Sequence, residues 1–216
     1  MKLEICAADI RSVLAAKSAR ADRVELCSAL EVGGLTPSEG LIRTAISSGI
    51  AVNVLIRPRP GDFVYDESEV CVMERDVERA VQLGVNGVVI GALRQDGSID
   101  MEICRRLMAK VGDVEVTFHR AIDRCSDILS SVEDVVRLGC CRILTSGGKY
   151  TASEGAEMIN QMVRIAGGRL SIMAGSGVTS ENVCHLIEQS GVTEVHASAK
   201  GQLAEMVSLR KIVSSM

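Results

Sequence analysis

The sequence predicts a single-domain α/β protein with the (β/α)8 architecture of a TIM barrel. Eight short runs rich in β-branched residues recur along the chain, and segments with helical periodicity lie between them. Strict alternation of strand and helix indicates a parallel sheet with right-handed crossovers. The chain has 216 residues, so each of eight units would have about 27, enough for one strand, one helix and two short loops.

The predicted strands are short apolar segments that are bounded by turn-forming residues. They are KLEIC (2–6), RVELC (23–27), VNVLIR (52–57), GVVIG (87–91), VEVTFH (114–119), CRILTS (141–146), LSIMAG (170–175) and TEVHAS (193–198). An open doubly wound sheet is the alternative, but it normally carries a glycine-rich fingerprint after its first strand, and ICAADIRS (5–12) has none. No linker or composition shift divides the chain, so we expect one closed barrel over residues 1–216.

The segments between the strands carry helix signals. In 73–84 and 127–139, apolar residues recur three and four positions apart. Glycines expected as C-terminal caps follow four predicted helices, at Gly49, Gly84, Gly139 and Gly191. Residues that favour helix starts stand at Thr36-Pro37, Asp100, Ser126 and Thr179.

Composition excludes several classes of function. Formal net charge is −4 with both signs mixed, and the chain has two Phe, two Tyr and no Trp, so nucleic-acid binding is not expected. No apolar run approaches the roughly 20 residues of a membrane span, and KLEICAADI (2–10) has neither the apolar stretch nor the cleavage site of a signal peptide, so none is expected. The eight cysteines are scattered without a C-x-x-C pair, which is typical of reduced thiols in the cytoplasm.

Several predicted strands place polar side chains at the end where the active sites of such barrels lie. Because residues two apart share a face of a strand, Glu4 points the same way as Cys6, and Glu25 the same way as Cys27. Other strand ends add Asn53, Leu55 and Arg57; Thr117 and His119 with Arg120 and Asp123 beyond; and Glu194, His196 and Ser198. A strand-end carboxylate is often only the partner of an arginine. Four strands nevertheless place polar or charged side chains on the same inward face. Burying unpaired charge is costly, so this agreement favours a functional site.

Two glycine-containing loops predict an anion site. MAGSGVTSEN (173–182) follows the seventh strand and ASAKG (197–201) the eighth, the positions where phosphate sites of barrel enzymes are common. We expect Gly175, Ser176, Gly177 and Ser198 to line it, with the helix after Thr179 directing its N–H groups at the anion. Glycines in tight turns are the ordinary alternative.

The chain resembles the CutC family of copper homeostasis proteins from its first strand to its eighth. The resemblance is carried by ADRVELCSALEVGGLTPS (21–38), IRPRPGDFVY (56–65), VTFHRAID (116–123), RILTSGG (142–148), GSGVT (175–179) and EVHASA (194–199). The family pattern often has GGGI and EFH where this chain has GSGV and EVH, and Ser176 in place of glycine bears on the anion pocket. The resemblance implies a (β/α)8 fold, a cytoplasmic homo-oligomer (dimer or tetramer) and a link to Cu(I).

Thiolates are preferred ligands of Cu(I), and neighbouring strands lie about 4.8 Å apart. Our first hypothesis is therefore that Cys6 and Cys27 hold one Cu(I), with His196 or His119 nearby. A disulfide between the two cysteines is the alternative, which a reducing compartment disfavours. The other cysteines are expected to be core residues.

Copper binding by two cysteines leaves the remaining polar residues unexplained. The alternative is an enzyme with isomerase-like or lyase-like acid–base chemistry on a small phosphorylated or carboxylated metabolite. Its candidate catalytic residues are Glu4, Glu25, Arg57, His119, Arg120, Asp123 and His196. Apart from Lys2, no lysine lies in a predicted strand, which disfavours a Schiff base. A binding or scaffold protein with an inert site is a third class, because fold alone does not exclude it.

Overall fold

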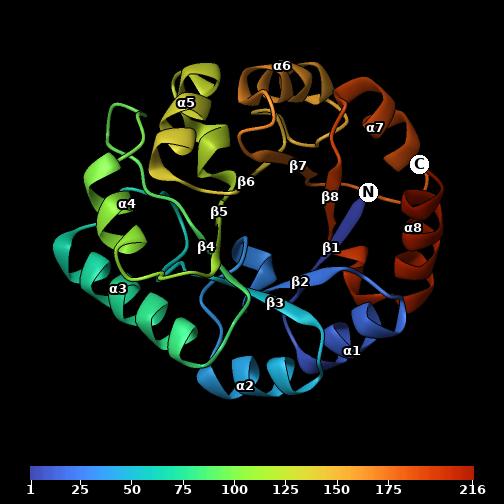
Figure 1. The fold of residues 1–216 in the computed structure, drawn as a ribbon, viewed down its shortest axis with the longest axis horizontal. Helices are drawn as coiled ribbons and strands as arrows, with labels where there is room; N and C mark the ends of the chain where they lie inside the picture. Colours follow the sequence, from blue (N-terminus) through green and yellow to red (C-terminus); the bar gives the residue numbers. More distant parts are fainter.

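Eight parallel strands pair in sequence order, and β8 pairs with β1 to close the barrel (Figure 1). The computed structural model describes all residues, 1–216. The strands are β1 (Lys2–Ala7), β2 (Arg23–Leu26), β3 (Ala51–Leu55), β4 (Gly87–Ile90), β5 (Glu115–Phe118), β6 (Arg142–Thr145), β7 (Ser171–Gly175) and β8 (Glu194–Ala197). The predicted (β/α)8 barrel is confirmed, and each strand starts within one residue of its predicted run.

A ring of eight helices surrounds the strands (Figure 1). They are α1 (Ile10–Ser18), α2 (Glu39–Ser47), α3 (Glu67–Gln82), α4 (Met101–Met108), α5 (Ile128–Leu138), α6 (Ala156–Ala166), α7 (Val183–Ser190) and α8 (Leu203–Ser215). Three short 3-10 helices follow β2, β5 and β8, namely η1 (Leu30–Val32), η2 (Arg120–Arg124) and η3 (Ala199–Gly201). None of the helices combines the length and hydropathy needed to cross a membrane.

Three helices begin later than predicted, each for a local reason. Ser38, rather than Thr36-Pro37, caps α2 by accepting a hydrogen bond from the backbone N–H of the third helical residue. Asp127, one residue after the predicted Ser126, caps α5 in the same way. After Thr179 the chain first makes a turn, and α7 starts only at Val183.

The inward phase of the strands is confirmed by the two hydrophobic clusters. Ile5 and Leu26 belong to the large cluster of 57 residues in which strands pack against helices. Cys6 and Cys27 belong instead to a separate cluster of four with Leu55 and Val89. The alternation of side chains along a strand places these two sets on opposite faces of the sheet. Both cysteines therefore lie inside the barrel.

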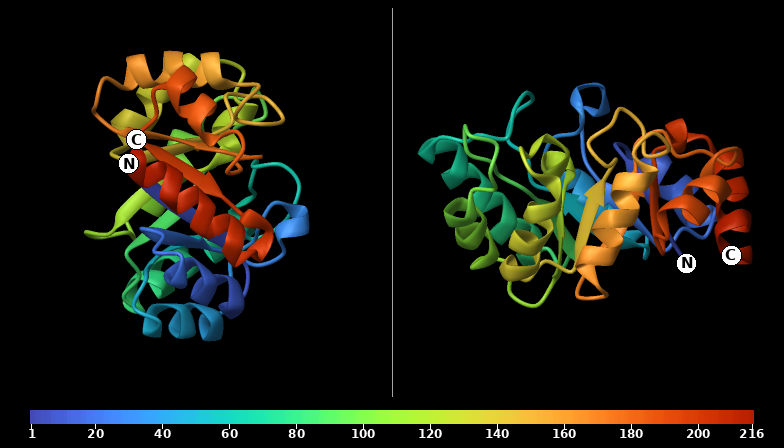
Figure 2. Two further views of the ribbon diagram at one scale, coloured as in Figure 1. Left: turned by 90° about the vertical axis from the view of Figure 1, so that its right-hand side faces the viewer. Right: turned by 90° about the horizontal axis from the view of Figure 1, so that it is seen from above.

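The carboxyl ends of the strands all lie at one end of the barrel, because the strands are parallel. In Figure 2 the blue segment after β2 and the teal segment after β3 project from the molecule on the side opposite the two termini. The termini lie near one another because β1 and β8 are neighbours. The loops that can form a site are thus gathered at one end.

Candidate functional site

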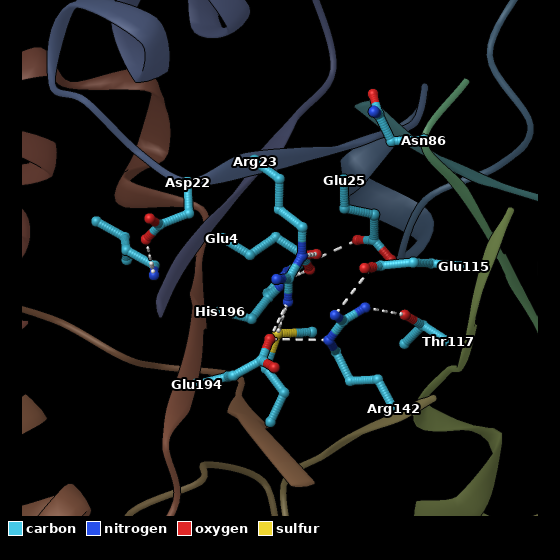
Figure 3. Close-up of polar contacts among 12 residues, drawn as sticks. Glu4, Asp22, Arg23, Glu25, Asn86, Glu115, Thr117, Arg142, Glu194 and His196 are labelled. Carbon is cyan, nitrogen blue, oxygen red and sulfur yellow. Dashed lines mark hydrogen bonds and ion pairs between the residues drawn. The ribbon is translucent and has the colours of Figure 1, made fainter. Parts of the chain in front are cut away.

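A buried network of ion pairs lies inside the barrel, near the N-terminal ends of the strands (Figure 3). Arg23, from the start of β2, donates to Glu4 at 2.5 Å and also to Glu194 of β8. Arg142, from the start of β6, donates to Glu194 at 2.8 Å and to the half-exposed Glu115 at 3.0 Å. Two guanidinium groups thus lie among carboxylates that balance them, which is the condition under which charge can be buried.

The sequence analysis overlooked Arg23 and Arg142. Both stand at the first residue of a strand, where a charged side chain is usually solvent-exposed. Arg23 is nevertheless two residues before Glu25, so the same alternation that placed Glu25 inside the barrel also placed Arg23 there. The signal was therefore present, but the partner, Glu194, is 171 residues away in the sequence.

Nearer the C-terminal ends of the strands, the side chains of Cys6, Glu25 and His196 lie close together. One ligand-type atom of each lies within 4.8 Å of the others, and all three residues are buried. The Cys6 thiol donates to Glu25 Oε2 at 3.6 Å, and His196 Nε2 lies 3.7 Å from that same oxygen. Cys27 Sγ is 3.8 Å from Cys6 Sγ, and both thiols are free. The structure thus brings the two predicted metal ligands together and places His196, one of the two histidines expected nearby, beside Cys6, with Glu25 as a further neighbour.

Glu4 fixes the orientation of the His196 ring. Burial raises the pKa of Glu4, but its hydrogen bond to His196 and the charge of Arg23 outweigh burial and lower this pKa to about 2. Glu4 is therefore ionised and can only accept, so His196 Nδ1–H donates to Glu4 Oε1 at 2.7 Å. The Nε2 atom of His196 is left facing Glu25, at 3.7 Å.

Three groups in this cluster have pKa values above their ordinary range. The hydrogen bond between the Cys6 and Cys27 thiols, burial, and the charge of Glu25 raise the pKa of the Cys6 thiol. Burial, together with the charge of Glu4, raises the pKa of Glu25. Burial lowers the pKa of His196, but the charge of Glu25 and the hydrogen bond to Glu4 reverse this and raise it. All three groups therefore hold a proton to higher pH than they would in water.

His119 lies apart from the cysteines, at the end of β5, and caps η2. Its Nδ1 accepts from the backbone N–H of Ala121 at 3.1 Å, and its ring packs on Phe63 with centroids 4.8 Å apart. A Cβ on Gly91, at the end of β4, would lie 2.5 Å from His119 Cε1, so glycine is required for the ring to fit. Burial first and the charge of Arg57 second lower the pKa of His119 to about 3, which makes it neutral.

Arg57 and Arg120 are both held by the protein, in different ways. The Arg57 guanidinium donates to the carbonyls of Val32, Gly34 and Gly61 at 2.9–3.0 Å and forms no ion pair. Arg120 is paired with Asp123 at 2.9 Å. Asp123 also accepts hydrogen bonds from side chains and backbone of the loop after β6, so its oxygens are fully occupied.

The predicted anion loop follows β7, but its polar groups already have partners. Ser176 Oγ donates to the carbonyl of Tyr150 at 2.8 Å, with Ser176 itself at a positive φ of 85°. The Ser180 N–H and Oγ both donate to Glu205 of α8, at 2.6 and 2.7 Å. The Ser180 donors at the start of the segment before α7 are thus already paired with a carboxylate of the protein.

A cavity of about 630 Å³ opens at this end of the barrel. The predicted site residues on its wall are Cys6, Glu25, Arg57, His119, Arg120, Ser176, Gly177, His196 and Ser198. The predicted site residues that do not line it are Glu4, Cys27, Asp123 and Gly175. Lys200 and Glu205, which the sequence analysis did not single out, also line this wall.

Comparison with known proteins decides the family. The model of the CutC family matches residues 1–201. The chain belongs to the CutC family. A CutC family protein of Pasteurella multocida is 47% identical over 208 residues, which cover 95% of this chain and 85% of the relative. Another from Xanthomonas campestris pv. campestris is 50% identical over 210 residues, covering 96% and 87%.

The crystal structure of a CutC protein from Streptococcus agalactiae has the same fold. Its TM-score is 0.88 at 37% sequence identity, and the match covers 92% of this chain and 98% of that one. The motifs that indicated CutC membership supply cavity-lining residues in this structure, including Glu25, Arg57, His119 and His196. The CutC resemblance and the cavity therefore concern the same end of the barrel.

Proposed function

We propose that this protein acts in copper homeostasis and binds one Cu(I) at Cys6 and Cys27, with His196 as a third ligand. The observation that carries the proposal is the 3.8 Å separation of the two free thiols beside the Cys6–Glu25–His196 cluster. Thiolates and imidazole suit Cu(I). Bonds of about 2.3 Å, as in zinc thiolates, allow one ion to contact two sulfurs at this separation. The relative from Streptococcus agalactiae is named for copper homeostasis.

The surroundings of His196 fit the role of a metal ligand. An imidazole that binds a metal through one nitrogen usually donates its other N–H to a carboxylate. His196 Nδ1–H donates to Glu4, which Arg23 holds ionised. Glu25, beside the thiol and the imidazole, can accept a proton that the metal displaces. We also propose a cytoplasmic location and a homo-oligomer, which the family resemblance supports.

An anaerobic Cu(I) titration against a competing chelator tests the proposal. The wild type should bind about one ion per chain, and the Cys6→Ser/Cys27→Ser double variant should lose this binding. The matched control is Cys71→Ser/Cys184→Ser, which also removes two thiols, neither of them buried. Equal loss in both double variants, or no loss in either, would mean incidental thiol affinity and would refute the site.

The cavity supports a second candidate function, an enzyme acting on a small anionic metabolite. Its volume, about 630 Å³, is in the range of small-molecule sites. The candidate acid–base groups on its wall are Glu25, with a raised pKa, and His119, which is neutral. Turnover that is lost in Glu25→Gln while the Cu(I) titration is unchanged would favour the enzyme.

A further inference from the structure

One buried hydrogen-bond donor on the cavity wall has no acceptor in the protein. His119 is 4% exposed and neutral, and its Nδ1 accepts from the Ala121 N–H. The ring proton of the neutral form must therefore be on Nε2. That atom is buried and has no hydrogen-bond partner. Buried donors are nearly always satisfied, so an unsatisfied donor at a cavity indicates an acceptor that comes from outside the protein.

A buried positive charge without a counterion lies next to this donor. The Arg57 side chain stacks on Phe63, with Cζ 5.1 Å from the ring centroid, and Phe63 in turn packs on His119. Arg57 is 5% exposed, and its partners are three backbone carbonyls rather than a carboxylate. These bonds hold the guanidinium in place but leave its charge unneutralised, which favours an anion nearby.

Two other groups of donors at this end of the barrel already have acceptors in the protein. The Ser180 N–H and hydroxyl at the loop before α7 donate to Glu205. Arg120 pairs with Asp123 and donates to Ser146 Oγ. At the Arg57–His119 end, by contrast, a buried positive charge and a buried N–H donor are left without partners.

We propose that the Arg57–His119 end of the cavity binds the oxyanionic group of a small metabolite, either a carboxylate or a phosphate. His119 Nε2–H donates to one oxygen of this group, and the fixed Arg57 charge attracts it. Phe63 packs against the ligand-binding ring and guanidinium and holds both in place. The site requires that the cavity takes a metabolite, as the second candidate function does, but it requires neither catalysis nor copper.

Nitrogen NMR of histidine rings tests the proposal directly, because the chain has only three histidines, His119, His185 and His196. In a buffer free of oxyanions, ¹⁵N-histidine protein is titrated with acetate and, separately, with inorganic phosphate. The Nε2–H signal of His119 should shift saturably with one or both probes, and which probe acts distinguishes a carboxylate from a phosphate site. The exposed His185 on α7 should not shift. No saturable shift at His119, or parallel shifts at both rings, would overturn the proposal.

Two variants separate the hydrogen bond from the fold. His119→Phe keeps an aromatic ring against Phe63 but removes the donor, and it should weaken binding of the active probe about tenfold or more. His119→Gln, which keeps an N–H donor, should retain part of the affinity, and His185→Phe should retain all of it. Wild-type affinity in a folded His119→Phe protein would overturn the proposal. If His119→Phe does not fold, the titration of the wild type alone decides whether the anion site exists. Both experiments measure binding, so a lack of enzymatic turnover would not change either result.

Discussion

Replacing Glu194 by Gln removes the carboxylate that two arginines share. Glu194 Oε2 accepts from Arg23 and from Arg142 Nε, and all three side chains are less than 10% exposed. In the variant, Arg23 keeps only Glu4, and Arg142 keeps Thr117 and the half-exposed Glu115. One positive charge is then left in the barrel interior without a buried partner, so we expect a large loss of stability.

The size of the loss follows from the burial of the network. Removing one partner of a buried ion pair costs about 3–5 kcal/mol, because an uncompensated charge stays behind. The total stability of a protein is about 5–15 kcal/mol. The matched control is Glu115→Gln, which breaks a pair with the same Arg142 at 3.0 Å. The Glu115 side chain is 50% exposed, so solvent screens this pair and the control should cost no more than about 1 kcal/mol.

Urea unfolding measures both variants. Far-UV circular dichroism follows the barrel, and tyrosine fluorescence from Tyr65 and Tyr150 serves as a second probe of the transition. With a urea m-value of about 2–3 kcal/mol per molar, Glu194→Gln should lower the midpoint by about 1–2.5 M. A shift no larger than that of Glu115→Gln would refute the reasoning, since it would mean that water or a rearranged arginine neutralises the site.

Three further predictions concern individual contacts. Gly91→Ala should cost about 1–3 kcal/mol in urea unfolding and shift the ring signals of His119, because the added Cβ would lie 2.5 Å from His119 Cε1. Asp127→Ala, which removes the cap that accepts from the Ser130 N–H, should cost about 1 kcal/mol. Burial and the charge of Arg57 lower the pKa of His119 to about 3 in the folded protein. As the pH falls, the His119 ring of the unfolded chain is therefore protonated before that of the folded protein. The contribution of His119 to the free energy of unfolding should therefore be complete above pH 6.5 and should decrease by up to about 1.4 kcal/mol per pH unit from there toward pH 3. The His119→Phe variant lacks this titrating group, so its stability should fall less steeply with acid.

The sequence predicted the strands well because their signals are local. Each strand of a parallel barrel is buried on both faces, so it appears as a short apolar run between turn residues. The same alternation that put Cys6 and Cys27 on one face predicted their meeting inside the barrel, and their sulfurs are 3.8 Å apart. Helix starts were less accurate, since neighbouring residues such as Ser126 and Asp127 are both good caps and only the geometry selects one.

The polar site was predicted only in part, because pairing depends on contacts that are distant in the sequence. Glu4 was expected at the mouth with the thiols, but it lies beside Arg23 and beneath His196. Glycines after β7 predicted an anion site, which stays a prediction, but the nearby Ser180 donors already pair with Glu205, 25 residues further along the chain. Local sequence shows which donors a loop offers and does not show which side chain elsewhere already accepts from them.

Glu4 couples the stability of the barrel to the chemistry of the proposed copper site. Arg23 contributes to the low pKa of Glu4, about 2, so the carboxylate is ionised at neutral pH. An ionised Glu4 must accept from His196 Nδ1, and this fixes Nε2 toward Glu25, which also contacts the Cys6 thiol. Loss of Glu4 would therefore weaken both the ion-pair network and the imidazole orientation. Cys6 and Cys27 take no part in that network, and for this reason their replacement separates metal binding from folding.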